Sequence, residues 1–130
     1  MRRNTDDAVV AWLDGQPAES IWTTSVTVFE VRLGLEIPDV GRRRRALEQA
    51  VDDLLRLDLQ NRIQPFDDAA ATAAADIAAK QRRSGRTVEI RDVQIAGIVA
   101  AREATLATRN LRHFEATGIE LVDPWSSTSP

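Results

Sequence analysis

Short segments of β-branched and apolar residues alternate with longer helical segments along this chain. Ile21–Thr24, Thr105–Thr108 and Ile119–Val122 have the character of strands, and helical patterns separate them. Strands that are separated by helices usually join through right-handed crossovers into a mostly parallel sheet, which helices cover on both faces. The alternation therefore predicts a small α/β fold with a parallel sheet.

The composition fits one globular domain. The chain has 130 residues, of which 43% are hydrophobic and 28% are charged, enough for a single core. We expect residues 1–125 to form this domain and residues 126–130 to be a disordered tail. No apolar run is long enough to cross a bilayer, and no apolar segment follows the charged amino terminus. These features predict a cytoplasmic protein without a membrane partner.

The ionisable residues limit the possible chemistry. The chain has no cysteine and a single histidine, His113, which excludes disulfides, thiolate sites and a zinc site built from several histidines. Any metal must be held mostly by oxygen ligands, which favours Mg²⁺ or Mn²⁺. The formal charge of −3 means that any binding of nucleic acid must be local.

Helical spacing and capping residues set the expected helices. We expect helices over Thr5–Asp14, from Ser25 to about Leu35, over Arg42–Leu57, from Asp67 to before Gly85, within Val88–Arg102 and over Leu111–Phe114. Ser25 or Thr27 is expected to cap the second helix, and Asp67 the alanine-rich fourth. The expected inward residues are Val26, Phe29 and Leu33, then Leu47, Val51, Leu54 and Leu55, and then Ile90, Val93, Ile95, Ile98 and Val99. Arg62–Phe66 is expected to be a short extended segment.

Three polar residues lie where a parallel sheet places its ligands, beyond the carboxyl ends of the strands. Glu30 follows the Ile21 strand on its helix, Asp92 begins a buried helix, and Asn110 follows the Thr105 strand. A single acid near a helix amino terminus is usually a dipole partner. Glu30 and Asp92, however, have apolar sequence neighbours, so a shared metal ion would satisfy both carboxylates.

Four segments resemble motifs of the PIN-domain family in the family's order. These segments are Val26–Gly34 with Glu30 before Arg-x-Gly, Arg91–Ala96 with Asp-x-x-Ile-Ala, Ala104–Asn110 ending in Thr-Arg-Asn, and Val122–Trp125. The chain is similar to VapC-type toxins of type II toxin–antitoxin systems, in particular to the FitB-like group.

The resemblance implies a PIN-like fold and a metal-dependent endoribonuclease. Glu30 and Asp92 would bind Mg²⁺ or Mn²⁺, and the ion would activate a water for in-line attack on an RNA phosphodiester. Asn110 would complete the catalytic set by donating to that water or to a phosphate. The resemblance also implies a VapB-type antitoxin partner and a homodimer.

Residues near Asn110 are the best candidates for contact with RNA. Arg109 is the first of them, with Thr108 and His113 beside it. His113 has two interpretations: a general acid/base or phosphate contact, or a structural residue next to Phe114. The basic run Arg42–Arg45 is either an RNA contact or a solvated helix end.

The family normally opens with an apolar strand that ends in Asp-x-Asn, and no such strand precedes the helix at Thr5. We therefore expect the natural protein to be longer at its amino terminus. The alternative is a catalytically impaired PIN-like protein that acts by binding an antitoxin or a dimer partner. A DNA-directed nuclease and a structural domain without a site are weaker alternatives.

Overall fold

The computed structural model describes residues 11–12, 14–36 and 41–125, and the chain divides into two compact units. The hairpin unit comprises Ala18–Pro65, and the core unit contains 66–125 together with the described residues before Ala18. Most of the helix expected at Thr5–Asp14, and the tail at 126–130, lie outside the described residues. Among the helices that are described, none is long and apolar enough to span a membrane.

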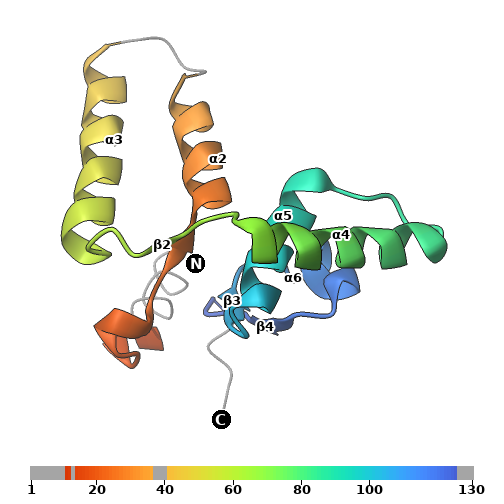
Figure 1. Cartoon of the computed structure of the whole chain (residues 1–130). Coiled ribbons are helices and arrows are strands. Elements are labelled where there is room, and N and C mark those ends of the chain that lie inside the picture. Colours follow the sequence, from red (N-terminus) through yellow and green to blue (C-terminus); the bar gives the residue numbers. More distant parts are fainter. Residues whose placement is uncertain (1–10, 13, 37–40, 126–130) are drawn as a thin grey trace. The chain divides into compact units, whose positions relative to one another are not determined.

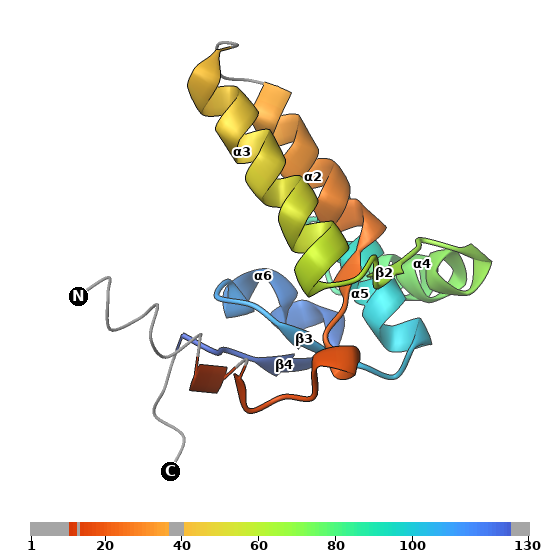
Figure 2. The same ribbon diagram turned by 90° about the vertical axis from the view of Figure 1, so that its left-hand side faces the viewer.

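The hairpin unit pairs two helices with a very short parallel sheet (Figures 1 and 2). Its elements are η1 (Ala18–Ser20), β1 (Thr23–Thr24), α2 (Ser25–Glu36), α3 (Arg42–Asp53), the π-helical turn η2 (Leu54–Asp58) and β2 (Ile63–Gln64). Thr23 of β1 lies opposite Ile63 of β2. Arg62, which precedes β2, connects the sheet to η1 by hydrogen bonds. Its Nη2 donates to the carbonyl of Ala18 in η1 at 2.7 Å, and its Nε donates to the Ile21 carbonyl at 2.9 Å.

The cap of α2 differs from the expected one. Oγ1 of Thr24 accepts a hydrogen bond from the backbone N–H of Thr27 at 3.0 Å, so Thr24 caps the helix rather than Ser25 or Thr27. The reason is local: Thr24 ends β1 in an extended conformation immediately before the helix, which directs its hydroxyl toward the free N–H groups of the first turn.

Several side chains of the hairpin that were expected to be inward are exposed. Val26 is buried, but Phe29 is 55% and Leu33 is 38% exposed, and on the second helix Leu47 and Leu54 are 43% and 48% exposed. Two-residue strands cover too little of these helices to bury a full apolar face. The continuous helix expected over Arg42–Leu57 also changes register at Leu54, whose carbonyl accepts from Leu59 at 2.9 Å in a π-helical turn.

The core unit contains the remaining elements. They are α4 (Asp68–Arg83), α5 (Ile90–Ala101), β3 (Thr105–Ala107), α6 (Leu111–Phe114), η3 (Glu115–Thr117) and β4 (Glu120–Val122). β3 and β4 pair in parallel, with Leu106 opposite Leu121. Both strand pairs are parallel and are joined through helices, which confirms the α/β class. Within the described residues the strands form two separate two-stranded sheets, not the single sheet expected from the sequence.

The core lies between α4 and α5. Ala70, Ala74 and Ile77 of α4 are buried, as are Ala96 and Ile98 of α5. Alanine and glycine at this contact let the two backbones approach closely. Asp67 caps α4 as expected, with Oδ1 accepting from the Ala70 N–H at 3.0 Å. Ile90 is 55% exposed and not inward as expected, because it occupies the first position of α5, where the helix begins.

Candidate functional site

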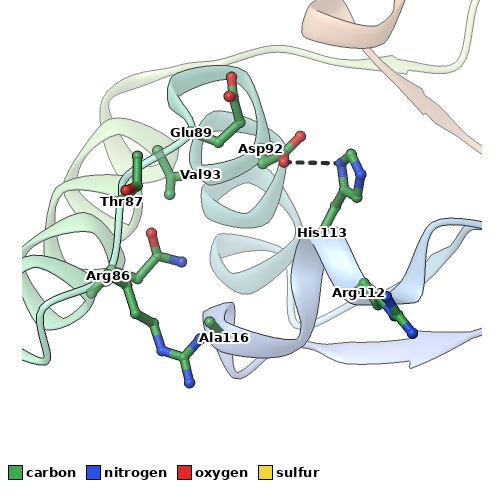
Figure 3. Close-up of a pocket in the computed structure, with 9 residues that line it drawn as sticks. Arg86, Thr87, Glu89, Asp92, Val93, Arg112, His113 and Ala116 are labelled. Carbon is green, nitrogen blue, oxygen red and sulfur yellow. Dashed lines mark ion pairs between the residues drawn. The ribbon is translucent and has the colours of Figure 1, made fainter.

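Asp92 and His113 meet at one end of the core unit. Asp92 lies in the first turn of α5, where the helix dipole favours a negative charge, and its side chain is only 16% exposed. Nδ1 of His113, from α6, lies 3.5 Å from Oδ2 of Asp92 (Figure 3). The His113 side chain is 61% exposed while Phe114 is 6% exposed, so Phe114 fills the core and His113 faces this site.

A chain of hydrogen bonds connects the segment that follows β3 to His113. The Thr108 N–H donates to the Val122 carbonyl at 2.9 Å, and Oγ1 of Thr108 accepts from the Asn110 N–H at 3.0 Å. The Asn110 carbonyl in turn accepts from the His113 N–H at 3.0 Å, while the Asn110 side chain makes no capping hydrogen bond to α6. Thr108 therefore sets the backbone that positions Asn110 and His113.

The side chain of Arg109 lies over the ring of Trp125 in the carboxyl-terminal segment. Its guanidinium carbon lies 5.5 Å from the centre of the Trp125 ring, within the range of a cation–π interaction. The backbone N–H of Trp125 donates to Oδ1 of Asp123 at 2.9 Å, which fixes the backbone that carries the Trp125 ring. The motif ending in Asp-Pro-Trp therefore supports an arginine next to Asn110.

A pocket of about 260 Å³ opens beside Asp92 and His113. It is lined by Gln81, Arg86, Thr87, Glu89, Asp92, Val93, Arg112, His113 and Ala116. Figure 3 shows the carboxylates of Glu89 and Asp92 on one side of this group and the Arg86 guanidinium on the other. A ligand with both polar and anionic parts would find complementary groups here.

Sequence reasoning pointed to Asp92 and His113 and missed most of the other lining residues, among them Gln81 and Arg112. The signal for Gln81 is its spacing from Ala74 and Ile77, which places a polar residue on the buried face of an otherwise alanine-rich helix. No comparable signal marks Arg112, because α6 is a single turn without a periodic pattern.

Glu30 lies in α2 of the hairpin unit and is partly buried there. Its joint action with Asp92 stays a prediction. Over the described parts of the chain, no group of at least three histidine, cysteine, aspartate or glutamate side chains could hold a metal ion. In the basic run Arg42–Arg45, Arg44 is engaged by Glu36 at 2.7 Å and Glu48 at 3.5 Å, which favours a structural role for that residue.

Comparison with known proteins defines the class. Residues 2–119 match the PIN domain family. The plasmid stability protein StbB of Pseudomonas syringae pv. tomato is 35% identical, over 97% of this chain and 91% of its own length. The VapC ribonuclease Y4jK of Sinorhizobium fredii is 34% identical, over 92% of this chain and 86% of its own length. The chain belongs to the PIN-domain family.

A solved structure supports the same conclusion. The structure of FitAB bound to an IR36 DNA fragment contains a chain that superimposes with a TM-score of 0.81 at 29% identity, covering 92% of this chain and 83% of that one. The likeness to VapC-type and FitB-like proteins that the four sequence motifs predicted is therefore confirmed.

Proposed function

We propose that this chain is a metal-dependent endoribonuclease, the toxin of a VapBC-type toxin–antitoxin pair. The observation that carries the proposal is the pairing of a largely buried Asp92 with His113, the single histidine, in a pocket that also contains Arg86 and Arg112. The relatives support the reaction class, since one of them is named a ribonuclease.

The metal would be Mg²⁺ or Mn²⁺, held by the carboxylates of Asp92 and Glu30. Two carboxylates would suit such an ion, because Mg²⁺ is usually bound through one or two carboxylates, with water and substrate phosphate oxygens as its other ligands. The chemistry that the bound ion supplies is activation of water and neutralisation of charge on the phosphate.

The chain's own residues would position RNA and move protons. Asp92 orients the His113 ring through Nδ1, which leaves Nε2 to exchange a proton with the water or the leaving oxygen. Water would give up a proton to Nε2 as its oxygen bonds to phosphorus, the bond to the leaving oxygen would break, and that oxygen would take up a proton. Arg109 contacts the RNA backbone, and Asn110 donates to a phosphate oxygen.

The proposed partner is a VapB-type antitoxin, and the proposed location is the cytoplasm. Structural neighbours support the partner, because they come from structures of FitAB and of VapBC, each bound to DNA. The antitoxin would inhibit this chain by covering the face that carries Asp92.

The experiment is RNA cleavage by the purified chain with Mg²⁺, with Mn²⁺ and with a chelator. We expect Asp92→Asn to abolish cleavage and His113→Gln to slow it by about 100-fold or more. Asp76→Asn is the matched control, because Asp76 is a 62% exposed acid on α4 that pairs with Lys80. Equal cleavage by wild type and Asp92→Asn would overturn the proposal.

The second candidate function is binding without catalysis by a PIN-like protein. The observation that favours it is the lack, in the described ranges, of three clustered metal-ligating side chains. Tight binding to the antitoxin by a chain that cleaves no RNA with either metal would establish this function instead.

A further inference from the structure

Gln81 is a buried polar residue that the proposed mechanism does not use. It lies on the face of α4 that packs toward α5, is 7% exposed, and lines the pocket beside Asp92 and His113. No hydrogen bond joins its side-chain amide to another described residue. Its amide atoms are not among the fully buried, unpartnered side-chain atoms of the described residues, so the pocket gives a ligand or water access to them.

The backbone holds Gln81 in place at the end of α4. Its carbonyl oxygen accepts from the N–H of Arg86 at 2.9 Å and from Oγ of Ser84 at 3.0 Å. Gly85 lies between these two residues with a φ of +79°, which closes the turn and brings Arg86 to the pocket. The same turn therefore presents a fixed amide and a guanidinium to one cavity.

The groups around Gln81 define the class of ligand. An amide offers one donor and one acceptor side by side, which matches the polar edge of a nucleobase. Arg86 and Arg112 provide positive charge for a phosphate, and the hydroxyl of Thr87 provides a further polar contact. A bare phosphate would accept from the amide NH₂ but leave its carbonyl oxygen unused, and an apolar ligand would use neither the amide nor the guanidinium groups.

We propose that this pocket binds one nucleotide of the RNA substrate and that the Gln81 amide recognises its base. The proposal rests on the proposed function, because RNA is the substrate assumed there. Gln81 would determine which nucleotide lies next to the cleaved bond, whereas Arg86 would bind any nucleotide equally.

The test is equilibrium binding of 5′-AMP, GMP, CMP and UMP, with ribose 5-phosphate as the ligand that lacks a base. NMR titration gives each Kd and follows the Gln81 side-chain NH₂ signal. We expect the best and worst nucleotides to differ by about tenfold in wild type, and ribose 5-phosphate to bind more weakly than the best nucleotide. Gln81→Leu should reduce the difference to about twofold or less, whereas Arg86→Ala should weaken all four nucleotides alike.

Two further variants keep the test decisive. Gln81→Glu preserves the size of the side chain and replaces the donor, so it should change the ranking of the nucleotides even where Gln81→Leu does not fold. Gln94→Leu is the matched control, because Gln94 lies on α5 outside the lining of this pocket and should leave the ranking unchanged.

An unchanged ranking in both Gln81 variants, or a Gln81 signal that no nucleotide shifts, would overturn the inference. A signal shifted only by an antitoxin peptide would also overturn it. Failure of the proposed function gives a different result: base discrimination that depends on Gln81, in a chain that cleaves no RNA, supports the pocket and contradicts the nuclease. Cleavage with one base preference in wild type and Gln81→Leu contradicts the pocket alone.

Discussion

Gly97 of α5 lies so close to Ala70 of α4 that a Cβ atom on Gly97 would be 2.5 Å from the Ala70 carbonyl oxygen. The same atom would be 2.7 Å from the Ala74 Cβ and 2.8 Å from the Ala74 backbone nitrogen. Two of these three atoms belong to the backbone, so a side-chain rotation cannot relieve the contact. The close packing of α4 and α5 therefore requires glycine at this position.

We predict that Gly97→Ala destabilises the protein by about 1–3 kcal/mol, because α4 and α5 must separate to admit the methyl group. Gly34→Ala is the matched control. Gly34 lies within α2, and a methyl group there would meet no atom within 4 Å, so alanine should stabilise by about 0.5–1 kcal/mol. Denaturant unfolding of both variants measures the two effects, and equal stability of Gly97→Ala and wild type would contradict the first.

The sequence predicted the elements better than it predicted their contacts. Asp67 and Gly85 carry local signals for the start and end of α4, and both predictions agree with the structure. The exposure of Phe29 and Leu33 was not predictable from spacing, since helical periodicity identifies an apolar face and not the element that covers it. The division of the strands into two sheets likewise depends on pairing between distant segments.

Asp67 combines a helix cap with an ion pair, and the two contributions can be separated. Its Oδ1 caps α4, while its Oδ2 pairs with Nη2 of Arg102 at 3.0 Å between side chains that are 40% and 43% exposed. We predict that Asp67→Ala costs about 1 kcal/mol or more, since the cap is lost. Asp67→Asn and Arg102→Met should each cost less than about 0.5 kcal/mol, because only an exposed ion pair is lost. Thermal unfolding that ranks Asp67→Asn with Asp67→Ala would show that the ion pair matters more than the cap.

Metal binding should depend on both Glu30 and Asp92. We predict that Glu30→Gln and Asp92→Asn each reduce the affinity for Mn²⁺ by about tenfold or more, because loss of one of two carboxylates leaves the ion with too few protein oxygen ligands. Calorimetric titration of Mn²⁺ measures this without any reaction, with Asp76→Asn as the control. Equal affinity in wild type and both variants would remove these residues from the metal site.

The candidate site shows which features a sequence reveals. Asp92 and Asn110 were identifiable because each lies at the boundary of an element and within a family motif. The contact between Asp92 and His113 joins α5 to α6, and the pocket also requires Gln81 of α4, so three separate helices have to pack before the site exists. Spacing along the chain carries no information about such packing.

We predict a homodimer in which α2 contributes to the interface. Phe29 is 55% exposed and Trp22 is 48% exposed in the hairpin unit, and large apolar side chains at this exposure favour association. Phe29→Glu should shift the protein to monomer in sedimentation experiments. Ile90→Glu, at an equally exposed apolar side chain of 55% in the core unit, is the control and should leave the dimer intact. A monomeric wild type at about micromolar concentration would contradict the prediction.

Arg109 should contribute to RNA affinity without reading sequence, and Trp125 should position it. Because Arg109 is an exposed guanidinium stacked 5.5 Å from the Trp125 ring, we expect it to contact phosphates and not base edges. Arg109→Ala should weaken binding to all short RNAs alike and reduce the slope of log affinity against log salt concentration by about one. Trp125→Leu keeps the charge but removes the stacking, so the affinity should fall by only about two- to fivefold.

Arg83→Ala removes the same charge from the exposed end of α4 and serves as the control. If Arg83→Ala and Arg109→Ala weaken binding equally, net charge accounts for the effect and Arg109 has no specific role.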